Sequence, residues 1–138
     1  MARQQDYTDF DPERLSASSC TVSDAHDGEG RYVQQRDGSG KYGHVKVIVS
    51  PHAGIHCFRF VWEPDESALP LSFMRAACFE GVRHALLKPL ADGREIAFVQ
   101  VSVIDGSYHH LDTDWRSLSA AAFLAVRNAL ERATLVNM

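Results

Sequence analysis

The most constraining feature of this sequence is a strongly apolar segment between Ile96 and Ile104, which reads FVQVSVI at positions 98–104. Its Val and Ile content favours a β-strand, and the segment is apolar enough for the centre of a sheet. The elements predicted along the chain run strand, strand, strand, helix, strand, helix, without an internal repeat. This order suits an α+β fold, in which a four-stranded sheet carries two helices on one face.

A helix is predicted on each side of this strand in the sequence. From Leu71 to Leu87, apolar residues recur at spacings of three and four, and Gly81 among them indicates close approach of another element. The second helix follows Asp112 to Asp114, which are candidate N-caps, and its Ala-rich middle permits tight packing on the sheet. Its apolar stripe, which we expect to face the core together with Phe123, comprises Trp115, Leu118, Ala122, Val126, Ala129 and Leu130.

A β-hairpin is predicted upstream of the first helix. Tyr32 to Gln35 is typical of a strand end, Asp37 to Gly40 of a turn, and Tyr42 to Val49 of a half-buried strand with alternating apolar residues. A further strand is expected at Cys57 to Trp62, before a loop that contains Pro64. After the long strand, Asp105-Gly106-Ser107 is predicted to form a turn.

The N-terminal region is much more polar than the rest of the chain. Residues 1–30 are dominated by Asp, Ser, Gln, Glu and Gly, and only Leu15 to Val22 has the character of a short strand. We therefore predict a mostly flexible arm over 1–30 and one domain over 31–138, with residues before about 15 poorly ordered.

Composition limits the function classes. The chain has 138 residues and a net charge of −4, with a pI of about 5.9, so any contact with phosphate has to come from a local basic patch. Its three cysteines are widely spaced without a CxxC pair, which indicates idle thiols rather than disulfides or a zinc knuckle. We expect neither a secretory leader nor a bilayer-spanning segment, and hence a cytoplasmic protein with no membrane partner.

Two segments carry a resemblance to a known family. Residues 32–45, YVQQRDGSGKYGHV, are similar to the run YVRQTGGRGQYGHV of elongation factor G, and residues 105–112, DGSYHHLD, are similar to its DGSYHEVD. Between them, residues 77–86, ACFEGVRHAL, resemble AVEKGIREAL, and the PLA at 89–91 also matches. The matches come in the same order over roughly three-quarters of the chain, and the chain thus resembles the fourth domain of this translational GTPase.

The resemblance implies a fold and a site. The fold is a four-stranded sheet backed by two helices, a split β-α-β arrangement with a left-handed crossover that is shared with a ribosomal-protein domain. In the family, two loops at the tip of this domain meet transfer RNA and messenger RNA. By position, the RNA-binding residues expected here are Gln35, Arg36, Gly38, Ser39, Gly40 and Lys41 in the first loop and Gly106, Ser107, Tyr108 and His109 in the second.

The same residues have an independent chemical interpretation. Cations around a Gly-rich turn can approach phosphates, and nearby aromatic rings can stack on bases. The cations are Arg31, Arg36, Lys41 and Lys46, and the aromatic residues are Tyr32 and Tyr42. A solvated hairpin with scattered charges would have the same composition.

Two departures from the family leave the function open. Ser39 stands where the family has a loop arginine, and Asp37 where it has a glycine. A translation-related protein that binds RNA or the ribosome through both loops is therefore one hypothesis. The other is a protein-interaction module that keeps the fold with an eroded tip. No GxxxxGK(S/T) motif is present, so we expect no nucleotide binding and no GTPase activity.

Catalytic and metal sites are not expected. Ser107, His109 and Asp112 are too close in sequence to assemble a triad, and Asp112 is better explained as a helix cap. His109-His110 lacks a third ligand at suitable spacing, and His52, His56 and Cys57 lie across a turn that need not bring them together. We therefore expect no enzyme activity and no cofactor.

Overall fold

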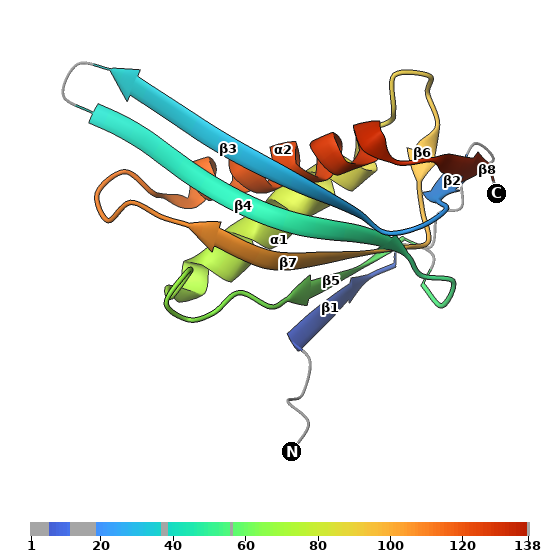
Figure 1. The fold of residues 1–138 in the computed structure, drawn as a ribbon, viewed down its shortest axis with the longest axis horizontal. Coiled ribbons are helices and arrows are strands. Elements are labelled where there is room, and N and C mark those ends of the chain that lie inside the picture. Colours follow the sequence, from blue (N-terminus) through green and yellow to red (C-terminus); the bar gives the residue numbers. More distant parts are fainter. Residues whose placement is uncertain (1–5, 12–18, 37–38, 56, 138) are drawn as a thin grey trace.

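The main element of the structure is a mixed sheet of five strands, in the order β1-β5-β7-β4-β3. It is seen in a computed structural model that describes residues 6–11, 19–36, 39–55 and 57–137. The strands are β1 (Asp6–Phe10), β3 (His26–Arg36), β4 (Ser39–Pro51), β5 (Phe58–Trp62) and β7 (Val99–Ser107). The four strands that were expected lie side by side, and β1 extends the sheet at one edge (Figure 1).

The pairing contains the predicted hairpin, but the β-α-β unit is not split as the resemblance implied, and the left-handed crossover stays a prediction. β3 pairs antiparallel with β4 over the whole length of β3, from His26↔Val49 to Arg36↔Ser39, and β4 pairs antiparallel with β7. β5 and β7 are parallel and are direct neighbours, connected through the first helix, so no strand lies between them. The register of β4 against β7 shifts by one residue between Lys46 and Val47.

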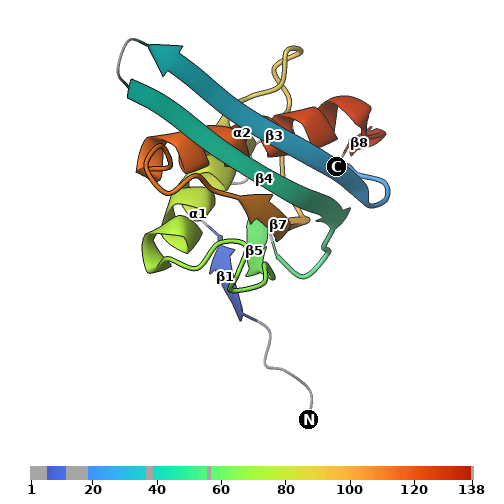
Figure 2. The ribbon, with the colours of Figure 1, turned by 60° about the vertical axis from the view of Figure 1, so that its left-hand side comes forward.

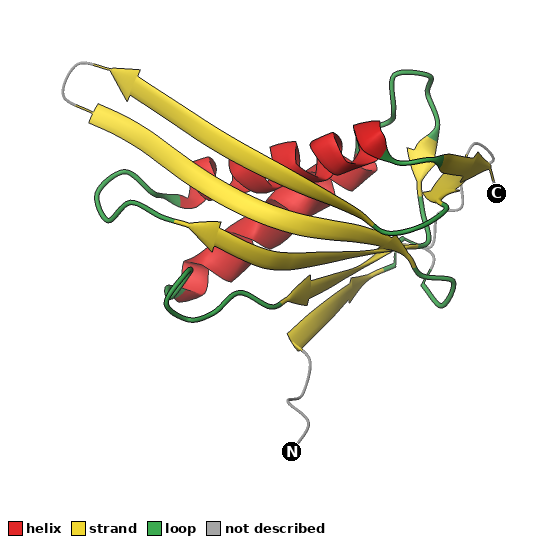
Figure 3. Cartoon of the chain, in the orientation of Figure 1, coloured by secondary structure: helices red, strands yellow, loops and turns green. Residues whose placement is uncertain are grey.

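Both helices, α1 (Ser72–Leu87) and α2 (Trp115–Arg132), pack on the same face of the sheet (Figures 1 and 3). Alternate strand residues supply this face, and Val45, Phe60, Val101 and Val103 are fully buried, which confirms their predicted place in the core. The rings of Phe58 and Phe60 meet Phe79 of α1 at centroid distances of 6.0 and 5.3 Å. No helix of the described residues lies on the opposite face of the sheet (Figure 2).

Glycines bring α2 unusually close to the hairpin strands. A Cβ on Gly30 would lie 2.0 Å from the carbonyl oxygen of Ala121, and a Cβ on Gly28 would lie 2.1 Å from that of Ala125. Such distances exclude any side chain, so helix backbone rests directly on strand backbone. Gly81 plays the same part between the helices, as predicted, because its Cβ would meet the Ser119 carbonyl at 2.2 Å.

The sheet extends further toward the N-terminus than the sequence indicated. β3 begins at His26, so the domain boundary expected at residue 31 falls inside a strand, and residues 6–10 pair with β5 as β1. The Asp-Gly-Glu-Gly run at 27–30 is typical of a turn, but here its glycines serve helix contact within an extended strand. The flexibility of the arm stays a prediction.

The central strand is also displaced from its expected limits. β7 runs from Val99 to Ser107, so the turn expected at 105–107 is wrong, and these residues continue the ladder beyond the register shift. Glu95–Ile96 form a separate strand, β6, because the backbone turns at Phe98, which has a φ of 56°.

A second sheet of three strands lies at the end of the molecule away from the hairpin turn (Figure 1). β2 (Ser19–Val22) pairs parallel with β6 and antiparallel with β8 (Leu135–Asn137). β2 lies within the interval in which a short strand was expected, whereas β8 was not predicted. Through β2, this sheet is also bonded to the β6–β7 connection, because the Ala97 amide donates to the Cys20 carbonyl and the Thr21 hydroxyl donates to the Phe98 carbonyl.

Three further observations complete the fold. Trp115 is 45% exposed, so its predicted place in the core is wrong, while Phe123 is half-buried. The three cysteines are free thiols, and burial raises the pKa of Cys78 to about 12 and that of Cys57 to about 11. Neither helix in the described part of the chain has the length and apolarity that a membrane span requires.

Candidate functional site

The two segments predicted to form the site meet at one end of the domain. The β7–α2 connection, residues 108–114, lies against the tip-side half of β4 (Figure 1). The Tyr42 amide donates to the Asp112 carbonyl at 3.0 Å, and the Thr113 hydroxyl donates to the Tyr42 carbonyl at 2.8 Å while it accepts from the His109 amide at 2.7 Å. These bonds fix the β7–α2 connection to the start of β4, and we call this contact the joint.

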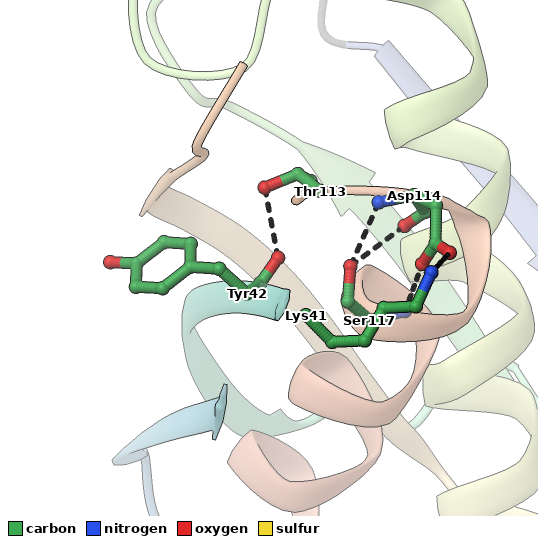
Figure 4. A network of polar contacts seen from close by, with 5 residues as sticks. All are labelled: Lys41, Tyr42, Thr113, Asp114 and Ser117. Atoms are coloured by element: carbon green, nitrogen blue, oxygen red, sulfur yellow. Dashed lines mark hydrogen bonds and ion pairs between the residues drawn. The ribbon is translucent and has the colours of Figure 1, made fainter. Parts of the chain in front are cut away.

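An ion pair and a helix cap share one carboxylate in this joint (Figure 4). Asp114 is the N-cap of α2 and forms a capping box with Ser117, in which each side chain binds the other residue's backbone amide at 2.9 Å. The Lys41 ammonium donates to the same Asp114 carboxylate at 2.6 Å. Desolvation opposes its ionisation, but the bonds from Lys41 and Ser117 hold the pKa of Asp114 below its ordinary value.

A polar cluster crosses three strands on the face without helices. The Ser107 hydroxyl on β7 is 2.7 Å from the Tyr42 hydroxyl and 2.9 Å from Nδ1 of His44, both on β4. Nε2 of the buried His44 lies 3.4 Å from the Glu29 carboxylate on β3. The neighbouring His44 is the largest cause that keeps the pKa of Glu29 below its ordinary value, and Lys46 and Arg31 act in the same direction. The cluster connects the hairpin to the central strand beneath the tip.

Carboxylates neutralise part of the predicted basic patch. Lys41 is paired with Asp114, and Lys46 lies 3.6 Å from Glu29. Nδ1 of His109 lies 3.4 Å from the Asp112 carboxylate. These three side chains, two at the tip and Lys46 further along β4, therefore have acidic neighbours, which weakens the positive field that they present to a polyanion.

The predicted site residues occupy three kinds of position. Gly40 and Lys41 lie against the β7–α2 connection, since a Cβ on Gly40 would lie 2.9 Å from the Asp112 carboxylate. The His109 side chain in this connection is 57% exposed. Gln35 is exposed on β3, whereas Gly106 and Ser107 lie within β7, and Gly106 is buried. Tyr108 is 38% exposed. Arg36 and Ser39 end their strands, their side chains are outside the described residues, and so is Gly38.

Some residues of the joint were not singled out from the sequence. Thr113 and His44 contribute through contacts with segments distant in sequence, which no local pattern reveals. Asp114 had a local signal, an Asp three residues before Ser117 at a helix start. It, and not Asp112, is the cap.

The described residues do not assemble the triad that the sequence brought into consideration. Ser107 is bonded to Tyr42 and His44, and it does not join His109 and Asp112 in a triad. Within the described ranges, no three His, Cys, Asp or Glu side chains gather in a way that would hold a metal ion. His56, considered above as a ligand, lies outside these ranges.

The fold and the joined loops define a single α+β domain of the type seen in a translation factor. The family model described as "Elongation factor G, domain IV" matches residues 16–134. The chain belongs to this domain family.

Similar proteins agree with this assignment. Elongation factor G of Fervidobacterium nodosum is 32% identical over 104 residues, which span 75% of this chain and 15% of that protein. The Thermotoga neapolitana factor is 31% identical over 116 residues, 82% of this chain and 16% of the relative. A crystal structure of a Thermus thermophilus protein matches 89% of this chain and 18% of its own, at 27% identity and a TM-score of 0.78. The chain thus spans less than a fifth of the length of these relatives.

Proposed function

We propose that this chain is a non-enzymatic, cytoplasmic protein of translation. It binds RNA or the ribosome through tip loops 35–41 and 106–109. The observation that carries the proposal is the joint itself. Residues as far apart as Tyr42 and Ser107, 65 positions in sequence, are bonded at one end of the domain. The family match covers both loops, and its members include elongation factor G, a factor of translation.

The chemistry of the tip suits a limited contact with RNA. Lys41 and His109 are each about half exposed, and the exposed Tyr108 offers a ring on which a base can stack. Because Lys41 and Lys46 have carboxylate partners, we expect only about two or three phosphate contacts. Binding should therefore be weak and strongly dependent on salt.

Co-sedimentation with ribosomal subunits at low and moderate salt tests this proposal. Lys41→Gln should weaken sedimentation and reduce the slope of log affinity against log salt by about one unit, because one phosphate contact is lost. Lys88→Gln is the matched control, since it removes the same charge at the C-terminal end of α1, away from the tip. There Lys88 lies over the Phe123 ring. The control should sediment like the unaltered protein. Equal sedimentation of all three proteins at every salt concentration would count against an RNA-binding tip.

A second candidate is a protein-interaction module that keeps the fold without the RNA contact. The carboxylates of Asp114, Glu29 and Asp112 beside the tip cations favour it, because they reduce the attraction for phosphate. If the unaltered chain does not sediment with subunits at any salt concentration, this second function replaces the first.

A further inference from the structure

The outer edge of β3 divides into two halves of different character. β3 is the edge strand of the five-stranded sheet, runs for 11 residues, and pairs with β4 without a bulge. At the base half, α2 covers the outward carbonyls: the Asn128 amide donates to the Glu29 carbonyl at 2.8 Å, and the Arg132 guanidinium to that of Asp27 at 3.3 Å. Side chains of α2 thus cap this part of the edge against another strand.

The tip half of the same edge lacks this protection. The α2 positions one and two turns before Asn128 are Leu124 and Ala120, which have no side-chain donor. The tip ends of β3 and β4 also extend beyond the start of α2 (Figure 1). Among the described residues, no other strand and no side chain bonds to the outward backbone groups of β3 between Arg31 and Gln35.

The orientation of these backbone groups follows from their partners across the hairpin. Val33 lies opposite Tyr42, whose amide and carbonyl both bond to the β7–α2 connection. The pair Val33–Tyr42 is therefore a non-hydrogen-bonded pair of the antiparallel ladder. The N–H and C=O of Val33 point away from β4, in the plane of the sheet, at its open edge. By the same alternation, so do Arg31 and Gln35.

This open segment is complementary to itself. An antiparallel copy centred on Val33 places Val33 against Val33, which is 52% exposed in the single chain, and places Arg31 opposite Gln35 twice. No like charges face each other between these residues. Two-fold pairing also places the two helices of one copy and those of the other at opposite ends of the dimer, because the pairing uses the projecting part of the hairpin.

We infer that β3 residues 31–35 form a weak homodimer interface, in which two copies of this chain pair antiparallel across Val33 and join their sheets. Five paired residues on each side bury far less than a standard interface of about 1,600 Å². The dimer should accordingly form only at high protein concentration. This inference does not depend on the proposed binding to the ribosome.

Sedimentation velocity of the full chain, up to about 1 mM, measures the self-association. The unaltered chain should shift from monomer toward dimer as the concentration rises. Val33→Pro should remain monomeric, because it removes the central outward donor while sparing the β3–β4 bonds. Val33→Thr, which keeps the N–H and the β-branched shape, should dimerise like the unaltered chain.

Charge at Gln35 tests the register even if the proline variant does not fold. Gln35→Glu places a carboxylate opposite Arg31 twice in the dimer and should tighten it about threefold or more, whereas Gln35→Arg creates two like-charge pairs and should weaken it by a similar factor. Ribosome binding should respond in the opposite direction, since Gln35→Arg adds a cation to the tip. The two proposals can therefore fail separately.

Three results would overturn the inference. The first is a monomeric unaltered chain at every concentration. The second is a dimer that Val33→Pro leaves intact. The third is a dimer whose strength does not respond to the charge at position 35 in the predicted directions.

Discussion

The contact between α2 and the hairpin strands and the joint at the tip hold the same strands by different means. At the first, Gly28 and Gly30 bring backbone within reach of backbone, and the fit depends on shape. At the tip, Tyr42, Asp114 and Thr113 hold the loops through a few polar bonds near solvent. The domain thus concentrates its packing at the base of the hairpin and holds the tip by separate polar contacts, so substitutions in the two regions should differ in their effect on the free energy of unfolding.

Gly30→Ala should cause the largest loss. Its Cβ would lie 2.0 Å from the Ala121 carbonyl oxygen and 2.5 Å from the Ala125 amide nitrogen, and both are backbone atoms that cannot rotate away. We expect a loss of about 3 kcal/mol in the free energy of unfolding, at the upper end of overpacking costs. Urea denaturation measures it.

The matched control is Gly54→Ala. There the nearest atoms belong to the His52 side chain, at 3.1 Å, and a side chain can move. The expected change is within about 0.5 kcal/mol. If both alanines cost the same, close backbone contact is not what distinguishes the base of the hairpin.

Asp114→Ala should have an intermediate effect. It removes the N-cap of α2 and the partner of Lys41, and we expect a loss of about 1–2 kcal/mol by thermal or urea unfolding. Asp112→Ala, two residues away and outside the capping box, should cost less than about 0.5 kcal/mol. The reverse order would show that the cap has been assigned to the wrong aspartate.

The contribution of Asp114 should also depend on pH. Because folding lowers its pKa from the ordinary value of 3.8, the ionised carboxylate stabilises the fold above that value. The stability is lost as the pH falls through the lower pKa of the folded state. The difference between the unaltered chain and Asp114→Ala should therefore be constant near neutral pH and shrink in acid.

Tyr42→Phe should have the smallest effect of the three. It removes the bond of 2.7 Å to the Ser107 hydroxyl but keeps the ring, so we expect a loss of about 1 kcal/mol. Tyr108→Phe, at a ring that is 38% exposed, should change the unfolding free energy very little. A loss above that of Gly30→Ala would mean that the polar joint, and not the glycine contact, dominates the hairpin.

The sequence predicted the elements whose apolar pattern is local. β4, β5, α1 and α2 lie close to their expected ranges, because each buries one face with its own periodicity. β1 escaped notice because Asp6–Phe10 is short and polar and is held by pairing with β5. The start of β3 was missed because Gly28 and Gly30 are typical of turns, and only the position of α2 reveals their use.

The meeting of the two predicted segments could be expected from the sequence, but their electrostatics could not. Both loops were located from their resemblance to a family, and the structure brings Gly40 and Lys41 against the β7–α2 connection. The pairing of Lys41 with Asp114 joins residues 73 positions apart, so no sequence pattern indicates it. Exposure of Trp115 was also missed, since its spacing in α2 matches the buried stripe.

The single-residue shift between β4 and β7 works like a change of reading frame. Up to Val103, odd-numbered residues of β7 face the helices; beyond the shift Gly106 faces them, and Ser107 turns to the open side to meet Tyr42 and His44. One inserted position, Ile104, thus lets a single strand direct its odd-numbered residues into the core before the shift and toward the open face after it. Its removal would leave most of the sequence unchanged and direct Ser107 into the core.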